Sequence, residues 1–278
     1  MSGLRPALCS VTLRHLQPAA VIDAAADAGL AAIEWGGDVH VPPGDINEAR
    51  RVGERTRGAG LAVSSYGAYL VAPDSPADMV HRAVETAAAL GADHIRIWPG
   101  TRDRPSQSYG PTERAAVASA IAAIADDASP HAITVGLEFH PGSLTDDAAS
   151  ARALVDAIGR DDVYLYWQPA PGLPLEAALD ELTLVGPDVC HLHVFAWDAE
   201  RRRYPLADHA AYWSAVFGAL PAGRWQKSRY AMLEFVAGDD LAQLRSDAAS
   251  LIALCDAPGA VSTPTETGAG PEGTCDDR

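Results

Sequence analysis

Apolar runs of strand length recur along the chain at regular intervals. Eight such runs are present, at residues 7–13, 31–37, 61–67, 94–100, 133–139, 163–169, 189–195 and 230–236. The segments between them are rich in Ala and have apolar positions at helical spacing, as in 18–30, 46–60, 76–92 and 111–128. Several of these segments end in Gly, as helices commonly do. The alternation predicts eight β–α units.

Eight units of this size match a (β/α)8 TIM barrel, which typically has about 250 residues. A doubly wound open sheet is the alternative, but it would be expected to carry a phosphate loop, and no GxGxxG motif follows the first strand. We therefore predict a single barrel over residues 1–258. Residues 259–278 are rich in Gly, Pro, Thr and acids, which predicts a disordered acidic tail.

The composition narrows the range of partners. At 48% hydrophobic and 21% charged residues it is typical of a globular protein, and no apolar run approaches the length of a membrane span. The first residues lack the apolar core of a signal peptide, so we predict a cytoplasmic protein. A net charge of -16 argues against a nucleic-acid partner.

Two kinds of chemistry are not indicated by the sequence. The four cysteines form no CxxC pair, which argues against a zinc knuckle. The single lysine, Lys227, follows RWQ in a predicted loop, which argues against a Schiff base.

Polar side chains close four of the apolar runs. They are Glu138, Gln168, His193 and Glu234, and in a parallel barrel the carboxyl ends of the strands carry the chemistry. Two carboxylates, an imidazole and an amide oxygen form a plausible site for a divalent cation. The mixed oxygen and nitrogen ligands favour Mn²⁺, with Mg²⁺, Co²⁺ or Zn²⁺ as alternatives.

Such a cation would leave positions open for two adjacent oxygens of a ketose or polyol. It would polarise the carbonyl and stabilise the enediolate that forms when a neighbouring proton is lost. The carboxylates beside it could move that proton. The pattern therefore predicts metal-dependent sugar chemistry.

On the basis of its eight β–α units and these strand-end residues, the chain through roughly residue 258 resembles the xylose isomerase-like TIM-barrel superfamily. That superfamily includes epimerases of the tagatose/psicose type, hydroxypyruvate isomerases, inosose dehydratases and type IV apurinic endonucleases. The resemblance implies that Glu138 and Glu234 are metal ligands and the catalytic acid/base pair. It implies that His193 is a further ligand, and it matches Glu34 to a glutamate late in strand two.

The chain departs from the epimerase pattern at two positions. Gln168 stands where the epimerases have an aspartate, which removes one negative charge from the metal site, and Pro171 stands where they have a substrate-binding histidine. The ligands of the endonucleases' three-zinc cluster cannot be assembled from this sequence, so we disfavour that activity.

Four further residues are predicted to position the substrate: Glu34, Arg96, Trp98 and His140. About half of the strand-end aromatic residues are expected to wall a sugar pocket; the candidates are Trp35, Tyr66, Trp98, Trp167, Phe195 and Trp197. The ERRRYP run at 200–205 follows strand seven and could supply an arginine to the barrel mouth, although such runs are more often solvated.

Each site residue also has a structural interpretation. Glu138 or Glu234 could form a salt bridge with Arg96, and Glu34 could be a buried ion-pair partner. His193 could be a hydrogen-bonded core histidine, His140 an exposed loop residue, and Gln168 an amide that binds sugar hydroxyls without a metal.

The leading hypothesis is a divalent-metal-dependent sugar isomerase or epimerase. An inosose-type dehydratase on the same scaffold is the first alternative, because it shares the proton loss beside a ketone. A barrel without metal or catalysis, serving as a ligand-binding or partner subunit, is the second. The expected partner is a small sugar or polyol. Members of the superfamily often form dimers or tetramers, so a homo-oligomer is an alternative to a monomer.

Overall fold

A closed barrel of eight parallel strands, paired in chain order from β1 to β8, forms the centre of the molecule. The computed structural model describes residues 3–257. The strands are β1 (Arg5–Cys9), β2 (Ala32–Gly36), β3 (Ala62–Ala72), β4 (His94–Pro99), β5 (Thr134–Glu138), β6 (Val163–Trp167), β7 (Val189–Val194) and β8 (Tyr230–Leu233). The predicted (β/α)8 fold is confirmed, and the predicted tail at 259–278 lies outside the described residues.

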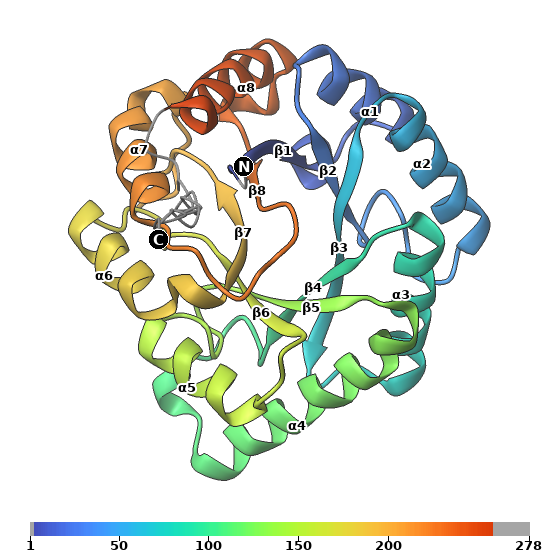
Figure 1. Ribbon diagram of the computed structural model, residues 1–278, viewed down its shortest axis with the longest axis vertical. Helices are drawn as coiled ribbons and strands as arrows, with labels where there is room; N and C mark the ends of the chain where they lie inside the picture. Colours follow the sequence, from blue (N-terminus) through green and yellow to red (C-terminus); the bar gives the residue numbers. More distant parts are fainter. Residues whose placement is uncertain (1–2, 258–278) are drawn as a thin grey trace, which may run out of the picture.

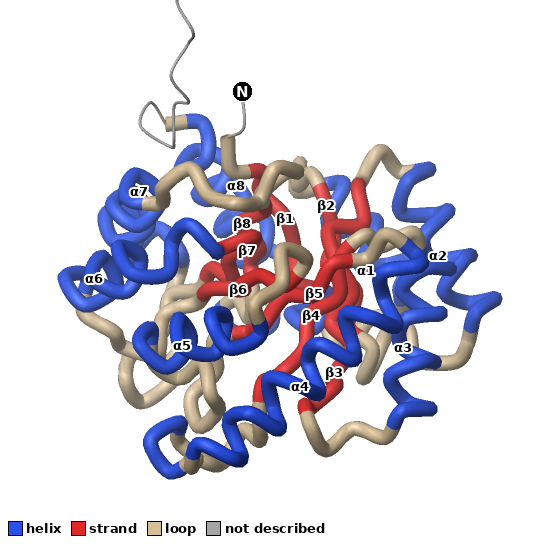
Figure 2. The backbone as a smooth tube through the Cα atoms, turned by 60° about the horizontal axis from the view of Figure 1, so that its bottom comes forward, coloured by secondary structure: helices blue, strands red, loops and turns tan. Residues whose placement is uncertain are grey.

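Helices surround the barrel on its outer side (Figure 1). They are α1 (Pro18–Asp27), α2 (Ile46–Gly58), α3 (Ala77–Leu90), α4 (Pro111–Ala128), α5 (Ala148–Ile158), α6 (Leu175–Val185), α7 (Ala210–Ala219) and α8 (Leu241–Asp256). A view from another side shows the strands enclosed by these helices (Figure 2). Among the described residues, no helix has the length and apolar character needed to span a membrane.

Local sequence signals explain where the helices begin. Asp45, Asp147 and Asp240 each precede a helix and accept a hydrogen bond from the backbone N–H three residues later, which satisfies a donor that the helix itself cannot. Proline occupies the first turn of α1 and α4, where its missing N–H costs nothing.

An apolar layer between the helices and the strands holds the barrel together. Helix residues such as Leu182, Trp213 and Leu251 are fully buried and belong to the large core cluster between helices and strands. The barrel interior is more polar, because the inward positions of the strands carry Glu34, Arg96 and His193 at 0–2% exposure. Buried charge of this density requires close pairing, and this pairing defines the candidate site.

Candidate metal centre in the barrel mouth

Parallel pairing brings the polar strand residues to one level of the barrel. Glu34 on β2 is in register with Cys9 on β1 and Ser65 on β3. Arg96 on β4 is in register with Gly136 on β5. Because residues paired in register share a face of the sheet, their side chains meet inside the barrel.

Gln168 reaches the same site because β6 ends one residue before it. Trp167, the last residue of the strand, points outward, where its Nε1 donates to Glu181 Oε2 on α6 at 3.0 Å and its ring packs against Trp213 on α7. Strict alternation then carries Gln168 inward. The Gln168 amide nitrogen donates to the carbonyl of Phe139 at 2.6 Å, which leaves its oxygen facing His193.

His193 Nδ1 lies at the centre of the predicted ligand set. It is 2.9 Å from Gln168 Oε1, 3.6 Å from Glu138 Oε1 and 3.5 Å from Glu234 Oε2. The ligand atoms of Glu138, His193 and Glu234 all lie within 4.8 Å of one another. An octahedral ion with bonds of about 2.1 Å has neighbouring ligands about 3.0 Å apart. The ligand atoms of Glu138, His193 and Glu234 are therefore close enough together to hold a small divalent cation, and Gln168 Oε1 lies beside His193 Nδ1.

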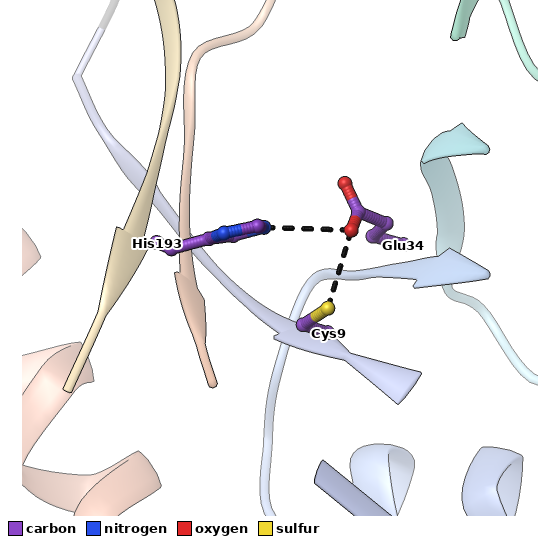
Figure 3. Close-up of side chains that lie close together, drawn as sticks. All are labelled: Cys9, Glu34 and His193. Carbon is purple, nitrogen blue, oxygen red and sulfur yellow. Dashed lines mark hydrogen bonds and ion pairs between the residues drawn. The ribbon is translucent and has the colours of Figure 1, made fainter. Parts of the chain in front are cut away.

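The other nitrogen of His193 faces Glu34. The Nε2–Glu34 Oε1 separation is 3.4 Å, and Cys9 Sγ lies 3.2 Å from the same oxygen (Figure 3). Nδ1 donates to the Gln168 oxygen, and although burial lowers the pKa of His193, the Glu234 and Glu34 carboxylates outweigh it and raise that pKa well above its usual value. A cation bound at Nδ1 would displace this proton, and the proton on Nε2 would stay beside Glu34, as in metal-ligating histidines. Glu34 is fully buried, and its Oε2 accepts from Ser65 at 2.8 Å and Tyr166 at 2.6 Å.

Arg96 joins the two sides of the site. Its Nε donates to Glu34 Oε1 at 3.0 Å, and its Nη1 donates to Glu138 Oε2. The salt-bridge interpretation of Glu138 is therefore correct for one oxygen, while Oε1 stays turned toward His193. Gly67 on β3 permits this pairing, since a Cβ there would lie 2.6 Å from Arg96 Nη2.

The charges separate the pKa values of the two predicted catalytic glutamates. Burial alone would raise the pKa of Glu138, but the Arg96 guanidinium and His193 outweigh it and hold the pKa below its usual value. Glu234 has no such guanidinium bond, so burial, with the Glu138 carboxylate adding to it, raises its pKa despite His193. Two carboxyl groups with opposite shifts are a frequent arrangement for a base and an acid.

Above these groups lies a cavity of about 190 Å³. Arg96, Glu138, Gln168 and Glu234 line it, together with the aromatic residues Tyr69, Trp98, Phe195, Trp197 and Phe235. Three of the six aromatic candidates thus wall the cavity, while Trp35, Tyr66 and Trp167 are core residues. His140 is half-buried and also lines the cavity.

Two predicted substrate contacts have other partners in the structure. Glu34 lies fully buried with both carboxylate oxygens engaged, and Arg96 donates to two carboxylates. Direct contact of either residue with a substrate stays a prediction. The sequence did not indicate Cys9, Ser65 or Tyr166, although each lies at an inward strand position next to Glu34. It also did not indicate Tyr69, which lines the cavity, because β3 bulges between Gly67 and Val71.

The fold defines a class of protein, the TIM barrels, and the strand-end site holds a buried group of side chains that could bind a metal. The chain belongs to the xylose isomerase-like TIM barrel family, whose model matches residues 22–253. No curated protein sequence matches the chain at a significant level.

Solved structures with this fold include enzymes of different activities. The probable 3-DHS dehydratase AsbF of Bacillus anthracis superposes with a TM-score of 0.74 at 18% identity, covering 90% of this chain and 99% of that one. A D-psicose 3-epimerase, solved in the presence of D-fructose, gives 0.65 at 16% identity over 90% and 97%. A xylose isomerase-like TIM barrel protein from Mycobacterium smegmatis in complex with magnesium gives 0.63 at 15% identity over 90% and 96%. At these identities the likeness concerns the fold.

Proposed function

We propose that this protein is a divalent-metal-dependent isomerase or epimerase of a sugar-like polyhydroxy carbonyl compound. The observation that carries the proposal is the charge balance of the site. Three buried carboxylates, Glu34, Glu138 and Glu234, face one guanidinium, Arg96. Despite burial, the carboxylates raise the pKa of His193, so without a cation its proton offsets one of the two remaining negative charges. A divalent cation that displaced this proton would balance both charges.

In this proposal Glu138, Gln168, His193 and Glu234 hold the cation. Mn²⁺ is the first candidate because the ligand atoms are oxygens with one imidazole nitrogen. When bound, the cation would polarise a substrate carbonyl and make the neighbouring C–H more acidic. Gln168 supplies a neutral ligand, so the site carries one negative charge fewer than it would with an aspartate at that position.

The chain's own groups would move the proton. Glu138 Oε1 and Glu234 Oε2 lie 3.6 and 3.5 Å from His193 Nδ1. One carboxylate would remove the proton next to the carbonyl, and the other would return a proton to the enediolate. Arg96 would act as a positioning residue: by holding Glu138 Oε2 it keeps that carboxylate ionised and aims Oε1 at the cation site. The aromatic walls would exclude water from the substrate.

A dehydratase is the second candidate. Its first step is the same proton removal, and what differs is the loss of a hydroxyl from the adjacent carbon. The observation that favours keeping it is the raised pKa of Glu234, because a carboxyl that retains its proton could protonate the departing hydroxyl. Products distinguish the two, since dehydration of a keto-polyol yields a conjugated product that absorbs in the ultraviolet.

Metal content tests the proposal. The full chain, purified without a chelating tag and analysed by mass spectrometry, is expected to hold close to one divalent ion. The Glu138→Ala variant is expected to lose it, while Glu85→Ala, at a half-exposed position on α3, retains it. If the wild-type protein takes up no metal even after soaking with Mn²⁺, the proposal fails, and a ligand-binding or partner subunit becomes the better interpretation.

A further inference from the structure

Two arginines beside the mouth cavity are left without a partner of opposite charge. Within residues 3–257, neither Arg102 nor Arg201 forms an ion pair or a side-chain hydrogen bond, although both line the cavity over the metal centre. Their neighbours in sequence are paired: Arg104 with Glu113, Arg202 with Asp198, and Arg203 with Asp239. Arg5, Arg55 and Arg245 are also unpaired among the described residues, but they lie at exposed positions away from this cavity. In the two loops beside the cavity, the unpaired arginines are the two that line it.

The flat face of the Arg102 guanidinium stacks on the ring of Trp98, which holds the side chain in place. The group lies 4.0 Å from the centre of the Trp98 ring, and stacking of this kind leaves the N–H edge free to bind a planar anion. The backbone of its loop is fixed against the β5–α5 loop, because Arg104 N donates to Gly142 O at 3.0 Å. Gly142 has a φ of 76°, and a Cβ there would lie 2.8 Å from the carbonyl oxygen of Arg102, so the close approach requires glycine.

Arg201 lies at the tip of a tight hairpin after β7. Trp197 and Arg203 form an antiparallel bridge, and Tyr204 N donates to Ala196 O at 2.8 Å. Arg201 itself adopts a φ of 62° and donates its N–H to Asp198 O at 2.9 Å. A non-glycine residue held in this conformation is a common feature of binding loops.

The two arginines mark the boundary between two connected hollows. The inner cavity of about 190 Å³ contains the carboxylates, and an outer, more open one of about 670 Å³ shares Arg102, His140, Pro141 and Arg201 with it. The inner cavity is smaller than the roughly 300–1,000 Å³ of most ligand pockets. A substrate with its reactive carbon beside Glu138 and Glu234 would thus extend its far end to this boundary.

The donors at this boundary fit a single negative charge. The buried Nε1 of Trp98 lacks a hydrogen-bond partner and can only donate. Asp74 and Asp103 also line the outer cavity, so the positive charge of the two arginines is partly offset there. This balance suits a monoanionic carboxylate better than a dianionic phosphate.

We propose that Arg102 and Arg201 bind a carboxylate at the far end of the substrate, which would make the substrate a sugar acid and not a neutral sugar. This inference rests on the proposed function, because it takes the reactive carbon to lie at Glu138 and Glu234. It adds a specificity site formed by two loops, separate from the strand residues that would hold the metal.

Matched pairs of ligands test the carboxylate. Calorimetry on the full chain would compare D-fructose with D-fructuronate, D-tagatose with D-tagaturonate, and add D-fructose 6-phosphate; each acid replaces a terminal hydroxymethyl group by a carboxylate. We expect at least one acid to bind about tenfold more tightly than its neutral partner. Arg102→Gln and Arg201→Gln should each reduce that preference to about threefold or less, while Arg245→Gln, at an exposed position on α8, should retain it.

Several outcomes would overturn the inference. They are equal affinity for acid and neutral sugar in both pairs, no binding of either acid, and a preference that persists in both arginine variants. Tighter binding of D-fructose 6-phosphate than of D-fructuronate, lost in the same variants, would replace the carboxylate by a phosphate.

Failure of this inference can be told apart from failure of the proposed function. The Glu234→Gln variant leaves both arginines intact, so it should keep the preference for the acid even without turnover. An acid preference in a wild-type protein that exchanges no substrate proton with solvent would contradict the proposed function alone. Proton exchange with neutral ketoses and no acid preference would contradict the carboxylate site alone.

Discussion

Arg96 Nε and Glu34 Oε1 meet at 3.0 Å inside the barrel, where the two side chains are 2% and 0% exposed. The same guanidinium also binds Glu138. This pairing places one fixed positive charge between two carboxylates and thereby allows three glutamates to share a buried site.

Removing the guanidinium should destabilise the protein strongly. Arg96→Leu leaves two buried carboxylates without their partner, and breaking a buried ion pair in this way typically costs about 3–5 kcal/mol. The free energy of unfolding, measured in urea at pH 7, checks this. Arg82→Leu is the control, because its pair with Asp78 is 49% and 68% exposed and should contribute less than about 1 kcal/mol. Similar losses in both variants would contradict the importance of the buried pair.

Replacing Gln168 by glutamate should raise the affinity for metal and lower the stability of the metal-free protein. Gln168→Glu adds a negative charge to the ligand set, and we expect the affinity for Mn²⁺ to rise at least about tenfold. Without metal the variant should be less stable by about 1–3 kcal/mol, because a carboxylate oxygen would replace the amide N–H that donates to Phe139 O at 2.6 Å. Metal titration and thermal unfolding with and without chelator measure the two effects. Unchanged metal affinity would remove Gln168 from the ligand set.

Glu234 should be needed for proton transfer and dispensable for folding. Glu234→Gln keeps the shape of the side chain, and loss of a general acid or base typically lowers a rate by about 10²–10⁴. Incorporation of solvent deuterium into the ketoses and uronates named above, followed by NMR, gives the rate, and the melting temperature checks the fold. Exchange at the wild-type rate would exclude Glu234 from the acid/base pair.

A pH-dependent part of the stability should come from Glu181. Burial raises the pKa of this carboxyl to about 7, above the roughly 4.3 expected in an unfolded chain. The folded state therefore binds more protons, and stability falls as the pH rises between these two values. Glu181→Gln keeps an acceptor for Trp167 Nε1 and should match the wild-type protein near pH 4.

Above pH 7 the Glu181→Gln variant should be the more stable by about 1 kcal/mol, a figure reduced for the partial exposure of the group. Urea unfolding of both proteins at several pH values measures the difference. A difference that does not change with pH would contradict the raised pKa.

The strand-end positions Glu138, His193 and Glu234 could be found from the sequence because a polar residue closing an apolar run is conspicuous. Their convergence then follows from barrel closure. Gln168 also follows an apolar run, but its inward position depends on β6 ending at Trp167. The apolar pattern of the sequence does not determine that strand boundary. The roles of these residues as ligands and catalysts stay predictions.

Other parts of the site depend on contacts that the sequence does not contain. Cys9, Ser65 and Tyr166 are ordinary strand residues in an apolar pattern, and only the register between strands places them around Glu34. The run 201–203 could be expected to supply an arginine to the mouth, but three adjacent arginines look alike in the sequence. The hairpin that pairs the second and third with acids determines which one is left over.

The groups proposed to perform the chemistry stand on or next to strands of the barrel, whereas Arg102 and Arg201 stand on loops. A loop can be exchanged without disturbing the sheet, so the two sets can evolve independently. Transplanting the 196–204 hairpin into a barrel with the same strand-end residues would then be a route to redesigning substrate preference, with the reaction itself left in place.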